Sequence, residues 1–158
     1  MRTEFLRSEF GTLRIHTLAN DELLRVSFSE NDVGRVEPDG DHSIAYRQLS
    51  EFFQRQRTEF DLKLALNRVG TPFQHRVWDL VSKIPFGQAR TYGQLAIMLG
   101  DRSLARAIGN ANAKNPFAII VPCHRVIGAD GSLTGYAGGL HRKAAILAFE
   151  QGVSGGLF

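Results

Sequence analysis

The sequence contains one cysteine, Cys123, and it stands directly before His124 and Arg125. Cysteine attacks as a thiolate, and a neighbouring base or cation increases the thiolate fraction at neutral pH. Imidazole is the side chain that most readily exchanges a proton in that range. A lone cysteine is also a frequent inert core residue. The three residues therefore indicate either a nucleophilic site or ordinary core, and the surrounding pattern must decide.

The residues before Cys123 favour a stiff, buried segment. Ile119–Val121 is an apolar run typical of a buried strand or extended segment. Pro122 fixes its own φ and biases the preceding residue away from the helical conformation. Because adjacent side chains on an extended backbone point to opposite sides, thiol and imidazole are poorly placed for direct contact, and a bridging water would join them.

A helix-turn-helix pattern lies upstream of this segment. Thr91 is a good N-cap for a short helix over Tyr92–Leu99, which would stop at Gly100. Residues 101–102 would form the turn, and Ser103 is predicted to cap a second helix. The buried face of that helix is predicted to consist of Leu104, Ala107, Ile108 and Ala111.

The opposite face of the second helix is unusual for a helix in water. Arg106 stands in the first turn, where the helix dipole disfavours a cation by roughly 0.3–1 kcal/mol. Small residues surround it, and they would let another surface approach the backbone closely. The face consists of Ala105, Arg106, Gly109, Asn110, Asn112 and Ala113. The pattern fits either a contact surface or an arginine that extends into water.

These motifs together resemble those of the O6-alkylguanine-DNA alkyltransferases. The resemblance rests on Pro122–Val126 and on Ala105–Gly109, and it runs in order from about Thr71 to Glu150. It implies a DNA repair protein that flips O6-alkylguanine out of the duplex, with O4-alkylthymine as a second candidate substrate. The alkyl group would pass irreversibly to Cys123 in one stoichiometric turnover, a methylated-DNA–protein-cysteine methyltransferase activity that needs no cofactor and no metal.

The resemblance also assigns roles to catalytic residues. Glu150 would orient His124, which would activate Cys123 through water, as in a carboxylate–imidazole–nucleophile triad. Tyr92 would crowd the 3′ phosphate of the target and donate a proton to the leaving guanine, while Asn115 would tie the recognition helix to the active-site loop. Without the family, a glutamate in the last turn of a helix is an ordinary solvated residue, although the dipole there disfavours an anion.

Contacts to DNA and to the flipped base follow from the same resemblance. Arg106 would fill the gap left in the base stack, from a helix in the minor groove, where readout of sequence is degenerate. The predicted DNA-binding residues are Tyr92, Ala105, Arg106, Gly109 and Asn112. The predicted base pocket consists of Val126, Tyr136, Ala137 and Lys143. The family often has serine where this chain has Ala137, so only a backbone contact to O6 remains there.

The elements that must position these residues read as an α/β protein in two parts. Residues 1–70 are predicted to form a small support domain, and 71–158 a mostly helical domain that carries the site. The first part would have a helix at about 43–57. Its two histidines, His16 and His42, are predicted to be ordinary surface residues. Its strands are predicted at Glu4–Ser8, Leu13–Leu18, Leu23–Phe28 and, less clearly patterned, Phe60–Leu66.

Two further helices are predicted in the second part. Thr71 and Pro72 mark the start of the first, with Trp78 at the edge of its apolar face. That face is predicted to consist of Phe73, Val77, Leu80, Val81 and Ile84. The last helix would run from about His141 to Gln151, with Glu150 in its final turn.

Composition narrows the setting of the protein. No apolar run approaches the roughly 18 residues of a membrane span, and one cysteine cannot form an internal disulfide, so we expect a cytoplasmic protein. Residues 1–70 carry a formal charge of −2 and residues 71–158 carry +5, within a net +3. The basic second part suits a polyanion, and we expect a monomer bound to double-stranded DNA.

Three other functions remain open from the sequence. A damage sensor resembling the alkyltransferase-like proteins would lack the acceptor, which Cys123 argues against. A helix-turn-helix regulator would read the major groove with a polar helix and usually dimerise. A Cys–His–Glu hydrolase would form an acyl-enzyme and turn over repeatedly.

Overall fold

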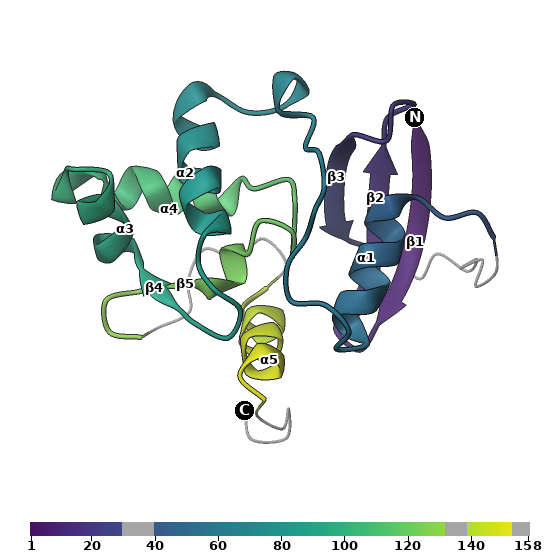
Figure 1. The fold of residues 1–158 in the computed structure, drawn as a ribbon. Coiled ribbons are helices and arrows are strands. Elements are labelled where there is room, and N and C mark those ends of the chain that lie inside the picture. Colours follow the sequence, from purple (N-terminus) through teal and green to yellow (C-terminus); the bar gives the residue numbers. More distant parts are fainter. Residues whose placement is uncertain (30–39, 132–138, 153–158) are drawn as a thin grey trace. The chain divides into compact units, whose positions relative to one another are not determined.

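The computed structural model describes residues 1–29, 40–131 and 139–152 (Figure 1). Contacts within it define two compact units, Met1–Val69 with Pro116–Ile120, and Gly70–Asn115 with Val121–Phe158. The sequence-based division at residue 70 assigned 116–120 to the second part, whereas these residues join the first unit. No helix among the described residues is long and apolar enough to cross a membrane.

The first unit is built on a three-stranded antiparallel sheet in the order β1-β2-β3. Its strands are β1 (Arg2–Ser8), β2 (Gly11–Thr17) and β3 (Leu23–Phe28). Alternate residues point to one face, so that Leu6 of β1 pairs with Leu13 of β2 and both are buried. The predicted meander is confirmed.

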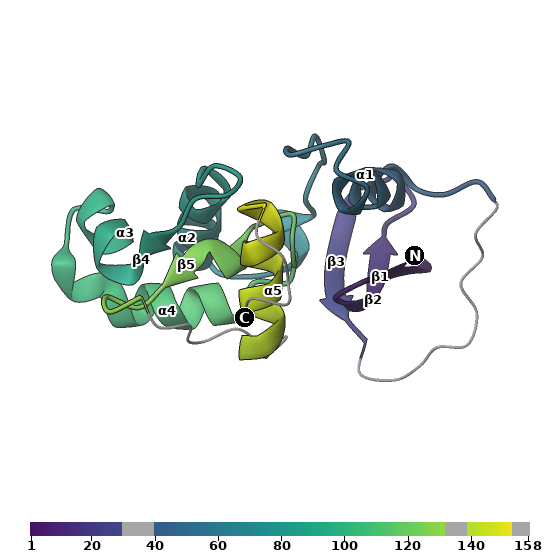
Figure 2. The same cartoon turned by 90° about the horizontal axis from the view of Figure 1, so that it is seen from below.

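Helix α1 (Ile44–Phe53) covers this sheet face (Figure 2). Ser43 caps it by accepting a hydrogen bond from the Tyr46 amide at 3.1 Å. The helix was predicted to reach about Arg57, but it ends four residues earlier, and Arg55 adopts a left-handed φ of 61° that a helix cannot continue through.

The predicted fourth strand at Phe60–Leu66 was wrong. The segment forms one parallel bridge, in which Leu64 lies beside Leu23, before a 3₁₀ turn η1 (Leu66–Arg68). Leu23 donates to Lys63 and accepts from Ala65, both at 2.8 Å. The apolar alternation of this segment reflects burial beside β3, but a single bridge does not make a strand.

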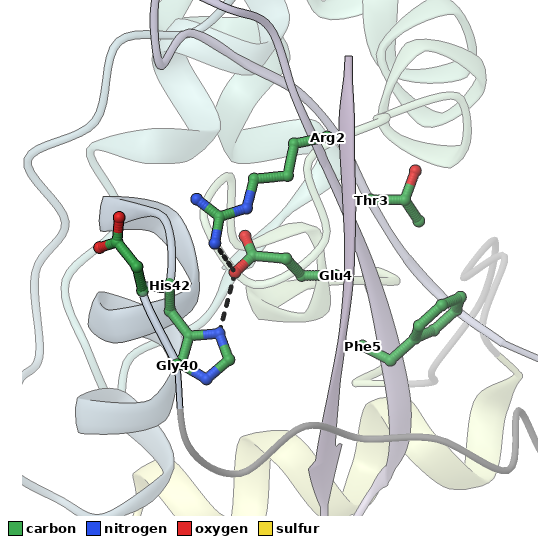
Figure 3. A pocket seen from close by; sticks show the side chains of 7 residues that line it. Arg2, Thr3, Glu4, Phe5, Gly40 and His42 are labelled. Carbon is green, nitrogen blue, oxygen red and sulfur yellow. Dashed lines mark hydrogen bonds and ion pairs between the residues drawn. The ribbon is translucent and has the colours of Figure 1, made fainter.

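A polar cluster lies where β1 meets the start of α1. Glu4 is buried and accepts hydrogen bonds from the amide and hydroxyl of Ser43, and its carboxylate lies 3.0 Å from His42 Nδ1. Figure 3 shows Arg2 and His42 directed at this carboxylate, which forms part of a pocket of about 300 Å³. His42 also stacks on Tyr46 with ring centroids 3.7 Å apart. The prediction of an ordinary surface histidine at this position was therefore wrong.

The second unit is mostly helical, as predicted. Its helices are α2 (Pro72–Ser82), α3 (Tyr92–Met98), α4 (Ala105–Ala113) and α5 (Leu140–Glu150). Two short strands, β4 (Arg90–Thr91) and β5 (Val126–Ile127), pair in parallel. Two 3₁₀ turns among the described residues of this unit are η2 (Arg102–Leu104) and η3 (Cys123–Arg125).

Capping boxes fix the starts of two helices in this unit. Thr71 and Gln74 exchange side-chain and backbone hydrogen bonds at α2, and Thr91 and Gln94 do the same at α3. The Trp78 side chain is buried and its indole donates to the Ala111 carbonyl of α4 at 2.8 Å. Trp78 was predicted to lie at the edge of the apolar face, but it joins α2 to α4 in the core.

The helix-turn-helix consists of α3, the turn η2 and α4. Asp101 accepts hydrogen bonds from the amide and hydroxyl of Ser103, so it caps η2. The prediction that Ser103 caps the second helix was wrong. Helix α4 begins at Ala105, and Leu104 at its N-cap makes no side-chain capping bond.

Candidate active site

Cys123 begins a tight turn and does not lie on an extended backbone. Its amide donates to the Val121 carbonyl at 2.7 Å, and the Arg125 amide donates to the Pro122 carbonyl at 2.9 Å. Cys123 is 5% exposed. Ile119 and Val121 are buried as expected, but the predicted extended segment was wrong: Ile119 has a left-handed φ of 71°, and the Ile120 amide donates to the Ala118 carbonyl at 2.8 Å. Because the chain turns both before and at Cys123, the alternation of side chains along a strand does not apply to Cys123 and His124.

Two asparagines near the end of α4 hold the carbonyls on this turn. Asn115 Nδ2 donates to the Val121 carbonyl at 2.8 Å, as expected for the residue that ties the helix to the loop. Asn112 Nδ2 donates to the Cys123 carbonyl at 3.3 Å. Asn112 was predicted to lie on the exposed face of the helix, but it is 1% exposed, so its placement on that face was wrong. Its last-turn position directs it at the turn.

His124 and Glu150 form a short buried pair. Nε2 of His124 lies 2.7 Å from Oε2 of Glu150, and both side chains are fully enclosed. Burial lowers the pKa of His124, against the hydrogen bond and charge of Glu150. His124 Nδ1 is buried and has no hydrogen-bond partner among the described residues. Because an ionised carboxylate only accepts hydrogen bonds, Nε2 carries a proton toward Glu150, and in the neutral ring Nδ1 is the atom that can accept one.

Glu150 has a second partner that the sequence did not reveal. Arg125 donates from Nε to Oε1 and from Nη2 to Oε2, both at 2.7 Å. Burial raises the pKa of Glu150, but the hydrogen bonds from His124 and Arg125 outweigh it and lower that pKa to about 2. The available signal was a charged residue in an otherwise buried run, since a buried arginine requires an anion.

The surroundings of the Cys123 thiol favour its protonated form. Burial raises the pKa of Cys123, and the Asn115 side chain and the charge of Lys143 oppose that rise. Lys143 of α5 is fully buried, and burial lowers its pKa to about 8 against the attraction of Cys123. A buried cation beside the thiol favours the thiolate once a base has taken the proton.

The β4–β5 pair joins the helix-turn-helix to the cysteine turn. Arg90 pairs with Val126 and Thr91 with Ile127, so Tyr92 starts α3 one residue after the strand that lies beside the turn. Val126, a predicted pocket residue, is buried. The pairing therefore brings the start of α3 close to the reactive turn.

Helix α4 links an exposed face to the turn. Arg106 is exposed in its first turn, and Ala105 and Gly109 are partly exposed. At 1.5 Å rise per residue, Arg106 and Asn112 are about 9 Å apart along the axis. A Cβ on Gly109 would lie 3.6 Å from the Tyr92 ring, an ordinary contact distance. The glycine is therefore not required by packing against α3.

The predicted pocket residues Tyr136 and Ala137 lie outside the described residues. Of the other predicted site residues, Cys123, His124, Glu150 and Asn115 meet at the turn.

Comparison with known proteins decides the family. The model for the 6-O-methylguanine DNA methyltransferase DNA binding domain matches residues 72–152. The methylated-DNA–protein-cysteine methyltransferase of Mycobacterium tuberculosis is 46% identical over 134 residues, which cover 85% of this chain and 80% of the relative. The chain belongs to the methylated-DNA–protein-cysteine methyltransferase family. The Methanosarcina acetivorans methyltransferase is 52% identical over 106 residues, 67% of each chain.

Solved structures of methyltransferases agree with this membership. The crystal structure of Mycobacterium tuberculosis OGT in complex with DNA has a TM-score of 0.83 and 42% identity, and the match covers 96% of this chain and 94% of that chain. The O6-methylguanine-DNA methyltransferase of Pyrococcus kodakaraensis is 23% identical with a TM-score of 0.65, which supports the fold alone. The two-part α/β fold predicted from the sequence is confirmed as that of this methyltransferase family.

Proposed function

We propose that this chain repairs DNA by moving an alkyl group from O6 of guanine to Sγ of Cys123, once per molecule. The observation that carries the proposal is the hydrogen-bonded pair of Glu150 and His124, beside the only cysteine in the sequence. Nδ1 of His124 is buried and has no hydrogen-bond partner within residues 1–29, 40–131 and 139–152. A thiol whose pKa is raised by burial needs such a base.

The transfer is a displacement at the alkyl carbon. His124 takes the Cys123 proton through a bridging water, and the thiolate attacks the carbon. An S–C bond forms as the O–C bond breaks, and its electron pair stays on guanine O6. Tyr92 is the candidate donor of the proton that the leaving guanine takes up. Lys143 stabilises the thiolate, while Glu150 stabilises the imidazolium.

The reaction ends with a thioether, and this accounts for a single turnover. Breaking that S–C bond would need a strong nucleophile, and the sequence has no second cysteine to supply one. A single free thiol also suits the reducing cytoplasm, in which we expect the protein to act as a monomer.

Access to O6 requires the base to leave the duplex. Arg106 is exposed on α4 among small residues, a face suited to the minor groove, and a guanidinium can stack in the gap left by a flipped nucleotide. Ala105 and Gly109 would let the DNA backbone approach, and Tyr92 would crowd the target phosphate. The net positive charge of residues 71–158 supports this encounter.

The flipped base would be held by the pocket residues that the resemblance indicated. Val126 directly follows the cysteine turn in the sequence, and the charge of Lys143 acts on the Cys123 thiol. Tyr136 and Ala137 complete the proposed set. O4-alkylthymine offers a similar exocyclic alkyl group, and we propose it as a second candidate substrate.

Mass spectrometry of the intact protein tests the transfer. After incubation with a duplex that contains O6-methylguanine, each chain should gain one methyl group in place of one hydrogen, and peptide mapping should locate it on Cys123. Cys123→Ser should gain none. Repeated turnover at limiting protein, or a label on another residue, would contradict the proposal and would favour the hydrolase alternative.

A pair of substrates tests the role of Arg106. Arg106→Ala should react slowly with alkylated duplex DNA because the flipped state is less populated, yet it should react at close to the parent rate with free O6-benzylguanine. Arg76→Ala, which removes another exposed arginine from α2, is the matched control. An equal loss on both substrates would assign Arg106 to the fold or the pocket.

A further inference from the structure

Glu150 is an anion in a place that disfavours negative charge, so it needs a positively charged partner. Glu150 is buried in the last turn of α5, where the helix dipole disfavours an anion. Taking a carboxylate out of water is strongly unfavourable unless a charged group balances it. His124 alone would balance it by holding a proton, and a protonated imidazole cannot act as a base.

Arg125 supplies that balance with a fixed geometry. Its guanidinium donates twice to Glu150 at 2.7 Å and a third time, from Nη1, to the Ile84 carbonyl at 2.6 Å. Its Cζ also lies 5.7 Å from the centre of the Phe86 ring. The planar fork of arginine matches the two carboxylate oxygens, which a lysine cannot do.

The balanced carboxylate determines the state of the imidazole. Oε2 of Glu150 accepts from Nη2 of Arg125 and lies 2.7 Å from Nε2 of His124. An ionised carboxylate only accepts hydrogen bonds, so Nε2 must carry a proton, and in the neutral ring Nδ1 then carries the lone pair. In the part of the chain that the structure describes, the charged and titratable groups that act on the ring or neighbour it are Glu150 and Lys143 from α5, and Arg125 and Cys123 from its own turn. Because the positive charge of Arg125 balances the negative charge of Glu150, the carboxylate does not favour a second proton on the His124 ring.

We propose that Arg125 is a positioning residue that keeps His124 neutral with its lone pair on Nδ1, by balancing and orienting Glu150. The inference rests on the proposed alkyl transfer and names a residue that acts on the reaction through Glu150. Without Arg125, the Glu150–His124 pair takes up a proton. On His124 that proton gives an imidazolium; on Glu150 it makes the carboxyl a donor to Nε2 and moves the ring proton to Nδ1. Either outcome removes the base.

The alternative is that Arg125 only braces the fold. A brace would lower the transfer rate and the melting temperature together, and it would leave the pH dependence of the rate unchanged. The balancing role predicts a shifted pH dependence, because the fraction of neutral base changes. The pH profile therefore separates the two interpretations.

The experiment compares Arg125→Met with the parent in single-turnover reactions with free O6-benzylguanine, which needs no DNA. Rates are measured between about pH 5 and 9, where imidazole titrates. We expect the acid limb of the Arg125→Met profile to move to higher pH by about one unit, which means about a tenfold lower rate on that limb. Arg76→Met removes an exposed charge from α2 and should leave the profile in place.

A double variant tests the charge argument directly. Arg125→Met with Glu150→Gln removes both charges, so no carboxylate remains to attract a proton. Its acid limb should return toward the parent position, although its rate stays low because the imidazole is less well oriented. A double variant whose acid limb lies as high as that of Arg125→Met would overturn the proposal.

Histidine ¹⁵N spectra give a readout that does not depend on the reaction. The His124 ring, assigned by comparison with His124→Gln, should be a neutral Nε2–H tautomer in the parent at neutral pH and should titrate at higher pH in Arg125→Met. If the parent takes up no alkyl group, the proposed function fails while this spectrum still tests Arg125. If Arg125→Met does not fold, Arg125→Lys should show a smaller shift in the same direction. An unshifted profile and an unchanged His124 spectrum would leave Arg125 as a brace and overturn the inference.

Discussion

Glu4 in the first unit and Glu150 in the second are both buried carboxylates, but they lie at opposite ends of a helix. Glu4 belongs to β1 and its carboxylate faces the start of α1, whereas Glu150 belongs to the end of α5 itself. The Glu4 carboxylate lies at the N-terminus of α1, where it accepts hydrogen bonds from the amide and hydroxyl of the N-cap Ser43. The dipole at that end favours an anion. Glu150 lies in the last turn of α5, where the dipole opposes it. These two carboxylates are therefore buried under opposite local fields.

The partners of the two carboxylates differ accordingly. Glu4 accepts hydrogen bonds from the uncharged amide and hydroxyl of Ser43 and lies close to His42. Its arginine partner, Arg2, is half-exposed, and the nearest charged atoms of the two side chains are 3.6 Å apart. Glu150 needs the enclosed fork of Arg125 at 2.7 Å on both oxygens. A charge placed against the local field and then balanced at short range indicates function, whereas a charge placed with the field stabilises the fold.

The largest expected difference between the two sites is in reaction rate. Glu150→Gln should slow alkyl transfer by roughly 10–100-fold, because a partner that orients a reactive group typically has that effect. Glu4→Gln should leave the rate at the parent value. Single-turnover rates with free O6-benzylguanine measure both, and binding to unmodified duplex should survive in each variant. Equal rates in the two variants would remove the distinction.

The next largest difference between Glu150 and Glu4 is expected in how the free energy of unfolding falls at acid pH. The folded pKa of Glu150, about 2, lies below its ordinary value of 4.5. The resulting stabilisation is fully present above pH 4.5 and is lost as the pH falls toward 2; the shift corresponds to about 3 kcal/mol. Denaturant unfolding at a series of pH values should show this loss in the parent and in Glu4→Gln. If Glu150→Gln showed the same loss, another group would be responsible.

A smaller effect is expected at the N-cap beside Glu4. Ser43→Ala removes the side-chain cap of α1 and the hydroxyl that donates to Glu4, while the backbone amide that also donates to Glu4 remains. Unfolding should therefore require roughly 1–2 kcal/mol less free energy. Ser50→Ala, in the same helix but away from Glu4, is the control and should change stability by less than about 0.5 kcal/mol. Alkyl transfer should be unaffected in both. A slower transfer in Ser43→Ala would mean that this cluster does more than support the fold.

The smallest effect is expected for Arg2→Ala. The Arg2 side chain is 46% exposed and lies 3.6 Å from Glu4, so its loss should change stability by roughly 0–1 kcal/mol. Thermal unfolding of Arg2→Ala beside Arg125→Met measures the contrast between an exposed and an enclosed arginine. A loss at Arg2 as large as that at Arg125 would contradict it.

Local signals in the sequence predicted much of the fold. The capping pairs at Thr71 and Thr91 depend on side chains three residues apart, and the strands depend on alternation over a few residues. The same kind of signal identified Cys123 and His124, which are neighbours in the chain. These features were predictable because the interacting groups are close in sequence.

Features that depend on distant partners were missed. Nothing near Arg125 in the sequence points to Glu150, 25 residues away. Trp78 was placed at an edge because helical periodicity does not show that Ala111 offers a free carbonyl. Asn112 was placed on the outer face because its position on the helical wheel gives no sign that the cysteine turn lies against it.

The short segment Pro116–Ile120 has a consequence for the order of folding. Val26 of β3 forms its bridge with Phe117, about ninety residues further along the chain, and Phe117 is fully buried. During synthesis the N-terminal part of a chain emerges first. The core of the first unit cannot be completed until residue 120 has been made, when the helix-turn-helix has already been synthesised. A ribosome stalled after residue 69 would hold every strand of the sheet but not the phenylalanine that closes its core.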